Sequence, residues 1–259
     1  MLIVLPPSEG KNVARRGRPV DLSDLSFPGL TDARERVLGA LVDLCADRPE
    51  VAATTLGIGH TQLDLVQLNA QLRTAPAARA DKVYSGVLYD ALDAATLSAG
   101  AKRRAGTRLA ITSSLFGLVR PGDRIPAYRL SGDTTLPGTG PVAAVWRDSL
   151  GYAMSDAVGR GLLVDLRSTM YAAFWRPPGE LAERVATVRV LHEVNGKRQV
   201  VSHFNKATKG RIVRALLEEG GTPRTPGELA DQLASLGWKV EVGHPGRRGT
   251  QVDVVVAEV

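Results

Sequence analysis

Cysteine is almost absent from this chain, which has a single one, Cys45, among 259 residues. One thiol excludes an internal disulfide and a metal site built from several cysteines. Its helical spacing from Val37 and Leu41 indicates a buried helical residue rather than a nucleophile.

Long apolar runs are also missing. No run approaches the ~20 residues that a membrane-spanning helix needs. The amino-terminal stretch MLIVLPPSEGK reaches two prolines before it has the length of a secretory signal. We therefore expect a cytoplasmic protein without a membrane partner.

The motifs of the common enzyme classes are lacking as well. The chain has no Gly-x-Ser-x-Gly elbow, no Walker loop and no zinc signature. Its histidines are scattered, and they are His60, His192, His203 and His244. The pattern around His192 places it on the inward face of a strand, which favours a buried residue over a ligand. We therefore expect no metal and no cofactor.

The charge is basic, with a net charge of +6 and a pI of about 9.7. A basic surplus attracts polyanions such as nucleic acid, although many proteins with a pI above 9 never bind DNA. The 44% of hydrophobic and 23% of charged residues are typical of a globular protein rather than a disordered one. Basic residues gather in five segments, which are 11–18, 102–108, 120–129, 197–214 and 247–248.

Strand and helix patterns interleave along the whole chain, with no repeat and no linker. This predicts a mixed α/β (α+β) fold, a single domain over residues 1–259 with a central mixed sheet and surrounding helices. The predicted strands are 2–5, 108–112, 162–166, 186–194, 200–204, 238–242 and 251–256, and 82–92 is expected to start as a strand and turn helical. The predicted helices are 32–46 with Asp32 as cap, 142–160, 206–219 and one capped by Thr225. Asn195-Gly196 predicts a hairpin turn.

Residues 56–59, Leu-Gly-Ile-Gly, fit the turn of a helix-hairpin-helix element. Gly57 and Gly59 would let backbone amides approach phosphate oxygens without a side chain in between. The flanking helices would be 32–46 and 61–72. The alternative is a glycine break between two packed helices.

Four cations lie near the start of the predicted helix 206–219, and they are Lys206, Lys209, Arg211 and Arg214. A helix start favours anions, so cations there are reasonable if phosphate is the partner. The alternative is a solvated basic face.

Arg120 and Arg129 flank a proline-rich turn and offer planar forks for phosphate or carboxylate. Arg129 could instead pair with Asp123 or Asp133. Tyr128 would be a core residue or a stacking platform.

Five polar residues fall at predicted strand-end loops or helix starts, and they are Ser8, Lys11, Ser168, Tyr171 and Lys206. Together with Tyr128 and Arg129 of the proline-rich turn, they are expected to form one pocket. Serine or tyrosine beside a lysine supports nucleophilic or acid–base chemistry when burial lowers the pKa of the lysine.

Five segments, in this order along the chain, resemble the YaaA family of bacterial peroxide-stress proteins. They are 5–11 (LPPSEGK), 83–86 (VYSG), 114–130 (SLFGLVRP…PAYRL), 165–171 (DLRSTMY) and 202–211 (SHFNKATKGR). The resemblance implies a compact mixed α/β fold, a basic cleft and a helix-hairpin-helix element that binds duplex or distorted DNA. It also implies a role in limiting damage from iron and hydrogen peroxide.

Three hypotheses follow. The first is a DNA-binding stress protein that neutralises phosphates with little base readout; its expected contacts are Lys11, Gly57, Gly59, Arg120, Arg129, Lys206, Lys209 and Arg211. The second is an enzyme acting on a nucleobase, nucleotide or similar small anionic substrate, with Ser168, Tyr171, Arg129 and Lys206 as its catalytic pocket. The third is an interaction protein without ligand chemistry. A flat basic cleft favours the first, and a closed pocket favours the second.

Overall fold

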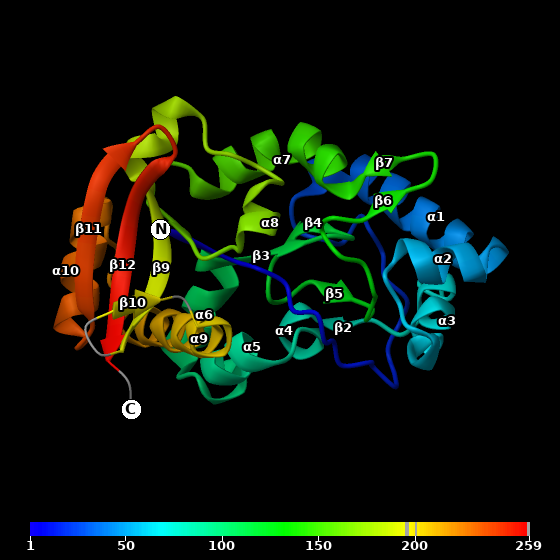
Figure 1. Cartoon of the computed structure of the whole chain (residues 1–259), viewed down its shortest axis with the longest axis horizontal. Helices are drawn as coiled ribbons and strands as arrows, with labels where there is room; N and C mark the ends of the chain where they lie inside the picture. The colour runs from blue at the N-terminus through cyan, green and yellow to red at the C-terminus, as the bar shows by residue number, and fades with distance from the viewer. Residues whose placement is uncertain (195–196, 200, 258–259) are drawn as a thin grey trace.

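One mixed sheet runs through the molecule (Figure 1). The computed structural model describes residues 1–194, 197–199 and 201–257. Within these residues the sheet has eight strands in the order β11-β12-β9-β8-β1-β3-β4, with β10 paired to β9. Its strands are β1 (Leu2–Leu5), β3 (Leu109–Ser113), β4 (Gly117–Val119), β8 (Leu163–Asp165), β9 (Val185–Val194), β10 (Lys197–Gln199), β11 (Lys239–Gly246) and β12 (Gly249–Ala257). The pairs among β3, β1, β8, β9 and β12 are parallel, while β4, β10 and β11 pair antiparallel. The predicted central mixed sheet is confirmed.

Strand β1 lies at the centre of the parallel part. Ile3 is opposite Leu109 of β3 on one edge and opposite Val164 of β8 on the other. All four residues of β1 are at most 1% exposed. Parallel strands covered on both faces have nearly continuous apolar sequences, and this is why the segment LIVL predicts a strand.

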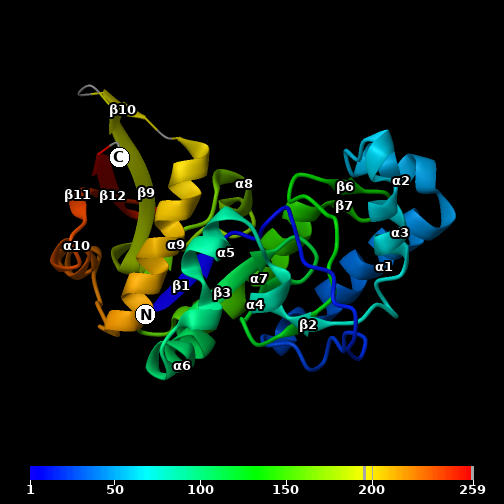
Figure 2. The same ribbon diagram turned by 90° about the horizontal axis from the view of Figure 1, so that it is seen from below.

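Helices cover both sides of the sheet. In Figure 1, α7 lies above β1 and β3, and α5, α6 and α9 lie below them; Figure 2 shows α5, α6 and α9 from that lower side. The α-helices are α1 (Thr31–Asp47), α2 (Pro49–Thr55), α3 (Asp64–Ala70), α4 (Ala80–Val83), α5 (Val87–Leu92), α6 (Ala99–Arg108), α7 (Val142–Val158), α8 (Thr169–Ala172), α9 (Ser202–Glu219) and α10 (Pro226–Ser235). The short 3-10 helices are η1 (Pro28–Leu30), η2 (His60–Gln62), η3 (Ala94–Thr96) and η4 (Gly179–Arg184).

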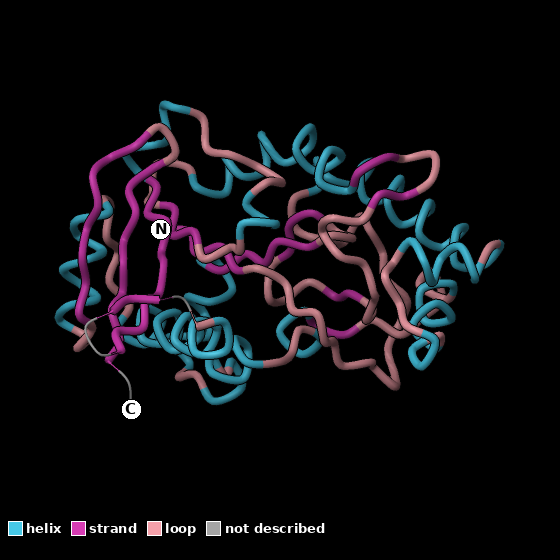
Figure 3. Tube along the Cα trace, viewed as in Figure 1, coloured by secondary structure: helices cyan, strands magenta, loops and turns pink. Residues whose placement is uncertain are grey.

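Helices α1, α2 and α3 gather at the end of the molecule away from β11 and β12 (Figures 1 and 2). Two small two-stranded sheets lie between them and the main sheet, joined by long loops (Figure 3). They pair β2 (Ala78–Arg79) with β5 (Arg124–Ile125), and β6 (Thr135–Leu136) with β7 (Gly140–Pro141).

Helix α9 begins at Ser202, so the predicted strand over 200–204 is wrong. The strand that pairs with β9 is β10, Lys197–Gln199, and the predicted Asn195-Gly196 turn lies outside the described residues. Val200 and Phe204 would share one face of a strand, whereas Val201 and Phe204 share one face of a helix, so this short apolar pattern fits either structure. Here the Asn205 amide donates to the Val201 carbonyl at 2.8 Å, which starts the helical hydrogen bonding.

Two other local predictions also need correction. The segment 82–92 has no strand; it spans the end of α4 and all of α5, and Gly86 separates the two helices with a φ of 91°. Asp32 is not the cap of α1, whose N-cap position is Leu30 without a side-chain hydrogen bond. The Thr225 cap is confirmed, because its hydroxyl accepts from the Glu228 amide at 3.2 Å.

Cys45 and His192 are buried, as the sequence predicts. No helix among the described residues combines the length and the apolar character required to cross a membrane.

The buried Arg34 of α1 connects that helix to the sheet. Its guanidinium donates to the carbonyls of Ser26, Phe116 and Leu118 at 2.6, 3.0 and 2.9 Å. Burial lowers the pKa of Arg34 to about 10, an effect that the nearby Asp123 carboxylate opposes.

We predict that Arg34→Ala lowers the free energy of unfolding by about 3 kcal/mol, because three buried carbonyls lose a charged donor. Urea denaturation followed by circular dichroism measures this. Arg36→Ala, which truncates an exposed arginine of the same helix, is the control and should change the free energy by less than about 0.5 kcal/mol. Equal effects of the two changes would contradict the assigned role.

Candidate functional site

The order of the strands marks the place where a ligand site is expected. The chain leaves β1 for β3 on one side, whereas β8 lies on the other side of β1 and leads to β9. In open α/β sheets, ligands bind outside the carboxyl ends of two such strands, where the strand order reverses. Residues 6–11 follow β1 at this point, and residues 166–168 follow β8.

The side chain of Lys11 lies among aromatic rings after β1. Its Nζ donates to the Ser8 carbonyl at 2.7 Å and to the Glu9 carbonyl at 3.4 Å. The same atom is 4.2 Å from the ring centroid of Tyr128 and 5.7 Å from that of Tyr84. Burial lowers the pKa of Lys11 to about 8; the Glu9 carboxylate opposes this shift and the Arg129 guanidinium adds to it. A lysine of this kind carries a reactive neutral amine near physiological pH.

Hydroxyl groups connect these aromatic rings to the end of β3. The Tyr128 hydroxyl is 3.1 Å from that of Tyr84 and 2.8 Å from that of Ser113, the last residue of β3. Tyr89 donates to the Pro6 carbonyl at 2.7 Å and stacks on Tyr84. Burial raises the pKa of Tyr84 and of Tyr128, so both phenols stay protonated. Tyr128 is 2% exposed, which makes it a core residue whose ring faces Lys11.

Arg129 places a positively charged guanidinium at the rim of this site. Its guanidinium forms an ion pair with Glu9, whose side chain is 58% exposed. The alternative pairing of Arg129 with Asp123 or Asp133 is therefore wrong, because its partner is Glu9. Asn69 of α3 is fully buried and holds the backbone of Arg129 in both directions: Oδ1 accepts from its amide at 2.8 Å and Nδ2 donates to its carbonyl at 2.7 Å.

The segment after β8 forms the other side of the site. Tyr171 of α8 is 5% exposed; burial raises its pKa, and Tyr128 and Glu9 are near enough to raise it further. We call Glu9, Lys11, Tyr84, Tyr128, Arg129 and Tyr171 the switch-point cluster. Five residues of the pocket predicted from the sequence thus lie close together through the contacts above, and they are Ser8, Lys11, Tyr128, Arg129 and Tyr171. That they form a pocket stays a prediction.

Helix α9 reaches the same edge of the sheet. Lys209 donates from Nζ to the Leu166 carbonyl at 3.0 Å, and burial lowers its pKa while Asp165 opposes the shift. Lys206 lies one turn earlier on the same face of α9, nearer its amino terminus. Lys206 and Ser168 are both exposed and have no side-chain hydrogen bond within the described part of the chain. They flank the cluster and do not join its hydrogen-bond network.

Asp165 and Arg167 form a buried ion pair beside this edge, with 2.7 Å between Arg167 Nη2 and Asp165 Oδ2. Burial alone would raise the pKa of Asp165, but the Arg167 guanidinium holds it below its usual range. The pair fixes the backbone that leads into Ser168, because Arg167 also donates to the carbonyls of Tyr171 and Trp175.

Residues 56–59 form the turn between α2 and α3, and we call them the glycine turn. Leu56 and Ile58 are 3% and 8% exposed, whereas the space around a Cβ at Gly57 or Gly59 is open. Gly57 has a φ of +60°, which favours glycine. The helix that precedes the glycine turn is α2. The prediction that the 32–46 helix precedes it is wrong, because that helix is α1, which ends before α2 begins.

Two predicted phosphate contacts lie apart from the cluster. Arg120 donates to the carbonyls of Thr107 and Leu109 at 2.7 and 2.9 Å, at the start of β3 and hence at the opposite edge of the sheet. Its guanidinium also lies 5.0 Å from the Phe27 ring centroid. Arg211 is exposed on α9, two residues beyond Lys209.

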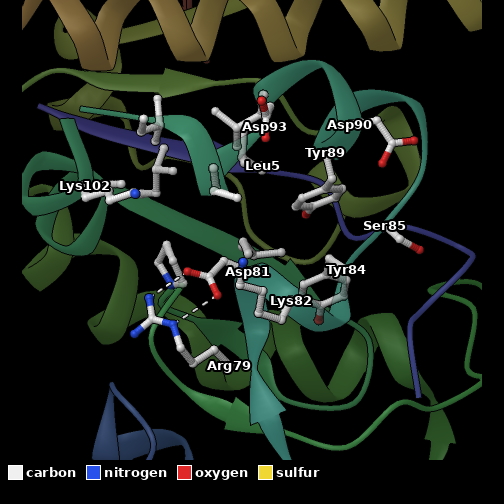
Figure 4. Close-up of a pocket in the computed structure, with 18 of the residues that line it drawn as sticks. Leu5, Arg79, Asp81, Lys82, Tyr84, Ser85, Tyr89, Asp90, Asp93 and Lys102 are labelled. Carbon is white, nitrogen blue, oxygen red and sulfur yellow. Dashed lines mark hydrogen bonds and ion pairs between the residues drawn. The ribbon is translucent and has the colours of Figure 1, made fainter. Parts of the chain in front are cut away.

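A cavity of about 500 Å³ adjoins the cluster on the far side of Tyr84. Leu5, Leu109 and Ile111 from the sheet line it, together with residues of α4, α5 and α6. Figure 4 shows Tyr84 and Tyr89 across the cavity from Lys102. Lys11 does not line this cavity.

The sequence analysis missed Glu9, Asn69, Tyr84 and Ser113 as parts of the site. Glu9 and Tyr84 both lie in segments that carry the family resemblance, at 5–11 and 83–86, and this was the available signal. Nothing local distinguishes Asn69, whose partner is 60 residues away.

Comparison with known proteins gives consistent matches over most of the chain. The family model of the peroxide stress protein YaaA matches residues 1–241. A UPF0246 protein of Streptomyces coelicolor is 52% identical over 261 residues, covering all of both chains. A UPF0246 protein of Corynebacterium efficiens is 44% identical over 257 residues, 98% of this chain and 100% of that protein. A UPF0246 protein of Shewanella loihica is 28% identical over 229 residues, 84% of this chain and 86% of that protein.

We predict that Asn69→Ala lowers the free energy of unfolding by about 2 kcal/mol, because the buried amide and carbonyl of Arg129 both lose their partner. Chemical denaturation measures the change. Asn12→Ala is the control, since the exposed Asn12 donates a single hydrogen bond to the Lys82 carbonyl, and its cost should stay below about 1 kcal/mol. A neutral Asn69→Ala would show that Asn69 does not hold Arg129.

Proposed function

The chain belongs to the peroxide stress protein YaaA family, and from this we propose that it is a cytoplasmic protein that binds duplex or distorted DNA and limits the damage caused by iron and hydrogen peroxide. The observation that carries the DNA-binding part is the glycine turn. Its two apolar residues are buried and its two glycines face open space, so the outer surface of the turn is bare backbone.

Bare backbone at a helix start suits a phosphate group. Within the described residues the Gly59 amide has no hydrogen-bond partner, and the helical segments η2 and α3 follow it directly. Unpaired amides at such a start bind phosphate oxygens. A contact of this kind reads no base, so binding would depend on the geometry of the DNA backbone.

The glycine turn and the switch-point cluster are connected through one helix. Helix α3 starts just after the turn, and its Asn69 holds the backbone of Arg129. Beyond Arg129, the exposed Lys206 lies near the amino terminus of α9, where both the ammonium group and the helix dipole favour an anion. A DNA backbone bound at the turn would thus continue toward cations of the cluster and of α9.

The second candidate function is an enzyme acting on a nucleobase, nucleotide or similar small anionic substrate. Lys11 favours it, because a partly buried amine with a pKa of about 8 lies against Tyr128 and is suited to act as a base or nucleophile. Arg129 would hold the anionic group of the substrate, and Tyr171, Ser168 and Lys206 would surround it.

We expect the affinity for labelled duplex, bubble and junction DNA to fall at least tenfold between about 50 and about 200 mM salt. Lys206→Ala should weaken binding to all three and reduce the slope of log affinity against log salt by about 1. Lys239→Ala, at an exposed lysine of β11 that pairs with Glu193, should leave both unchanged. Absence of binding at low salt would rule out the DNA proposal and favour a thermal-shift screen of nucleobases and nucleotides.

We also predict that Gly59→Ala weakens DNA binding about tenfold, because a Cβ keeps the phosphate from the amide and a hydrogen bond to a charged group is lost. The fold should tolerate the change, since Gly59 has a φ of −72° and open space around it. Gly151→Ala, on α7 with equally open surroundings, is the matched control. If both variants bind DNA like the parent protein, the glycine turn is only a break between helices.

A further inference from the structure

Lys11 has a setting that DNA binding alone does not require. A phosphate contact needs a freely exposed cation, yet Lys11 is partly buried and its amine donates to the carbonyls of Ser8 and Glu9, beside the ion pair of Glu9 with Arg129. It faces the rings of Tyr128 and Tyr84 at the point where the strand order reverses. Desolvation beside a second cation is the arrangement that makes a lysine nucleophilic.

We propose that Lys11 forms a Schiff base with the aldehyde of an abasic deoxyribose in DNA, and that the protein then cleaves the strand on the 3′ side of that sugar. This inference rests on the proposed DNA binding. It adds a covalent reaction and names a substrate class, which is DNA that has lost a base.

The substrate class follows from which electrophiles DNA offers to an amine. The C1′ carbon of an intact nucleotide is bonded to its base and has no free carbonyl, while nucleobase carbonyls belong to amide-like rings. Loss of the base leaves an aldehyde at C1′, with a phosphate on each side. Without its base, the sugar is small enough to turn toward the partly buried amine of Lys11.

The positive charges near Lys11 could bind the two phosphates that flank an abasic sugar. Arg129 lies on one side of the amine and raises the positive potential there. Lys206 and the amino-terminal end of α9 lie toward the segment that follows β8. The phosphates before and after the sugar would contact these two groups.

The reaction balances without an oxidant or a cofactor. The neutral Lys11 amine adds to C1′, and water leaves as the imine forms. A carboxylate, which we assign to Glu9, takes the proton from C2′; the C2′–H pair forms the C2′–C3′ double bond while the C3′–O bond breaks and its pair leaves on the 3′ phosphate. Water then hydrolyses the imine, releasing an unsaturated aldehyde and the free Lys11 amine.

The test traps the imine with borohydride on a labelled duplex that has a single abasic site, using the full-length protein. We expect a covalent protein–DNA band, with the adduct mapped to Lys11 by mass spectrometry. Lys11→Arg keeps the charge and the carbonyl contacts but cannot form an imine, so the band should fall at least tenfold. Lys239→Arg, at an exposed lysine outside the site, should trap as well as the parent protein.

Binding to a duplex with a tetrahydrofuran abasic analogue, which lacks the aldehyde, separates this inference from DNA binding itself. Parent protein that binds the analogue but yields no trapped band would overturn the inference and leave the DNA proposal intact. An adduct mapped to another amine, or a band that survives Lys11→Arg, would overturn the role of Lys11. Loss of binding to the analogue as well would instead contradict the DNA proposal.

Two further readouts address the mechanism. Trapping should rise about fivefold between pH 7 and 8 and level off above that, since the neutral amine is the attacking form and the pKa of Lys11 is about 8. Glu9 opposes this pKa shift and Arg129 supports it, while the buried phenols of Tyr84 and Tyr128 stay protonated. Glu9→Gln should keep trapping but slow strand cleavage at least tenfold. A rise of about tenfold per pH unit that continues from pH 7 to 9 would mean that an ordinary exposed lysine reacts.

Discussion

The parallel pairing of β1 with both β3 and β8 is the constraint on which the rest of the site depends. The four buried residues Leu2–Leu5 set the direction of the strand and its register with β3 and β8. Pro6 and Pro7 end it at the edge of the sheet. The residues that follow are held in place by two contacts. The Ser8 hydroxyl accepts a hydrogen bond from the Ser85 amide, and Lys11 forms an isolated antiparallel β-bridge with Tyr84. The packing of these apolar residues thereby positions the Lys11 amine at the carboxyl end of β1.

Much of the fold follows from the sequence because its signals are local. β1, α7 and α10 agree closely with their patterns of apolar residues and caps. The failures lie where two patterns compete. Val200, Val201 and Phe204 carry an apolar spacing that suits either structure, and the packing of α9 against α5 favours the helix. At Gly210 a Cβ would lie only 2.2 Å from the Leu88 carbonyl, so these helices approach closely along their length.

The site was less predictable than the fold, because several of its residues act through partners that are far away in the sequence. Lys11 and Tyr171 are separated by 160 positions, and their placement at the ends of predicted strands was enough to group them. Asn69 and Glu9 escaped because their roles exist only through partners 60 and 120 residues away. Arg120 was expected with the same group because it is near Arg129 in sequence. However, β5 lies between them, and the Arg120 side chain donates to the carbonyls at the start of β3, at the opposite edge of the sheet from the cluster.

The glycine turn has a consequence for how such a protein would be distributed on a chromosome. The proposed phosphate contact, made by a backbone amide where no side chain stands in between, would have no means to prefer one DNA sequence over another. Occupancy would then scale with copy number and with the amount of exposed or deformed DNA, as it does for abundant packaging proteins. Selection could adjust coverage through expression level, while the four residues of the turn stay unchanged.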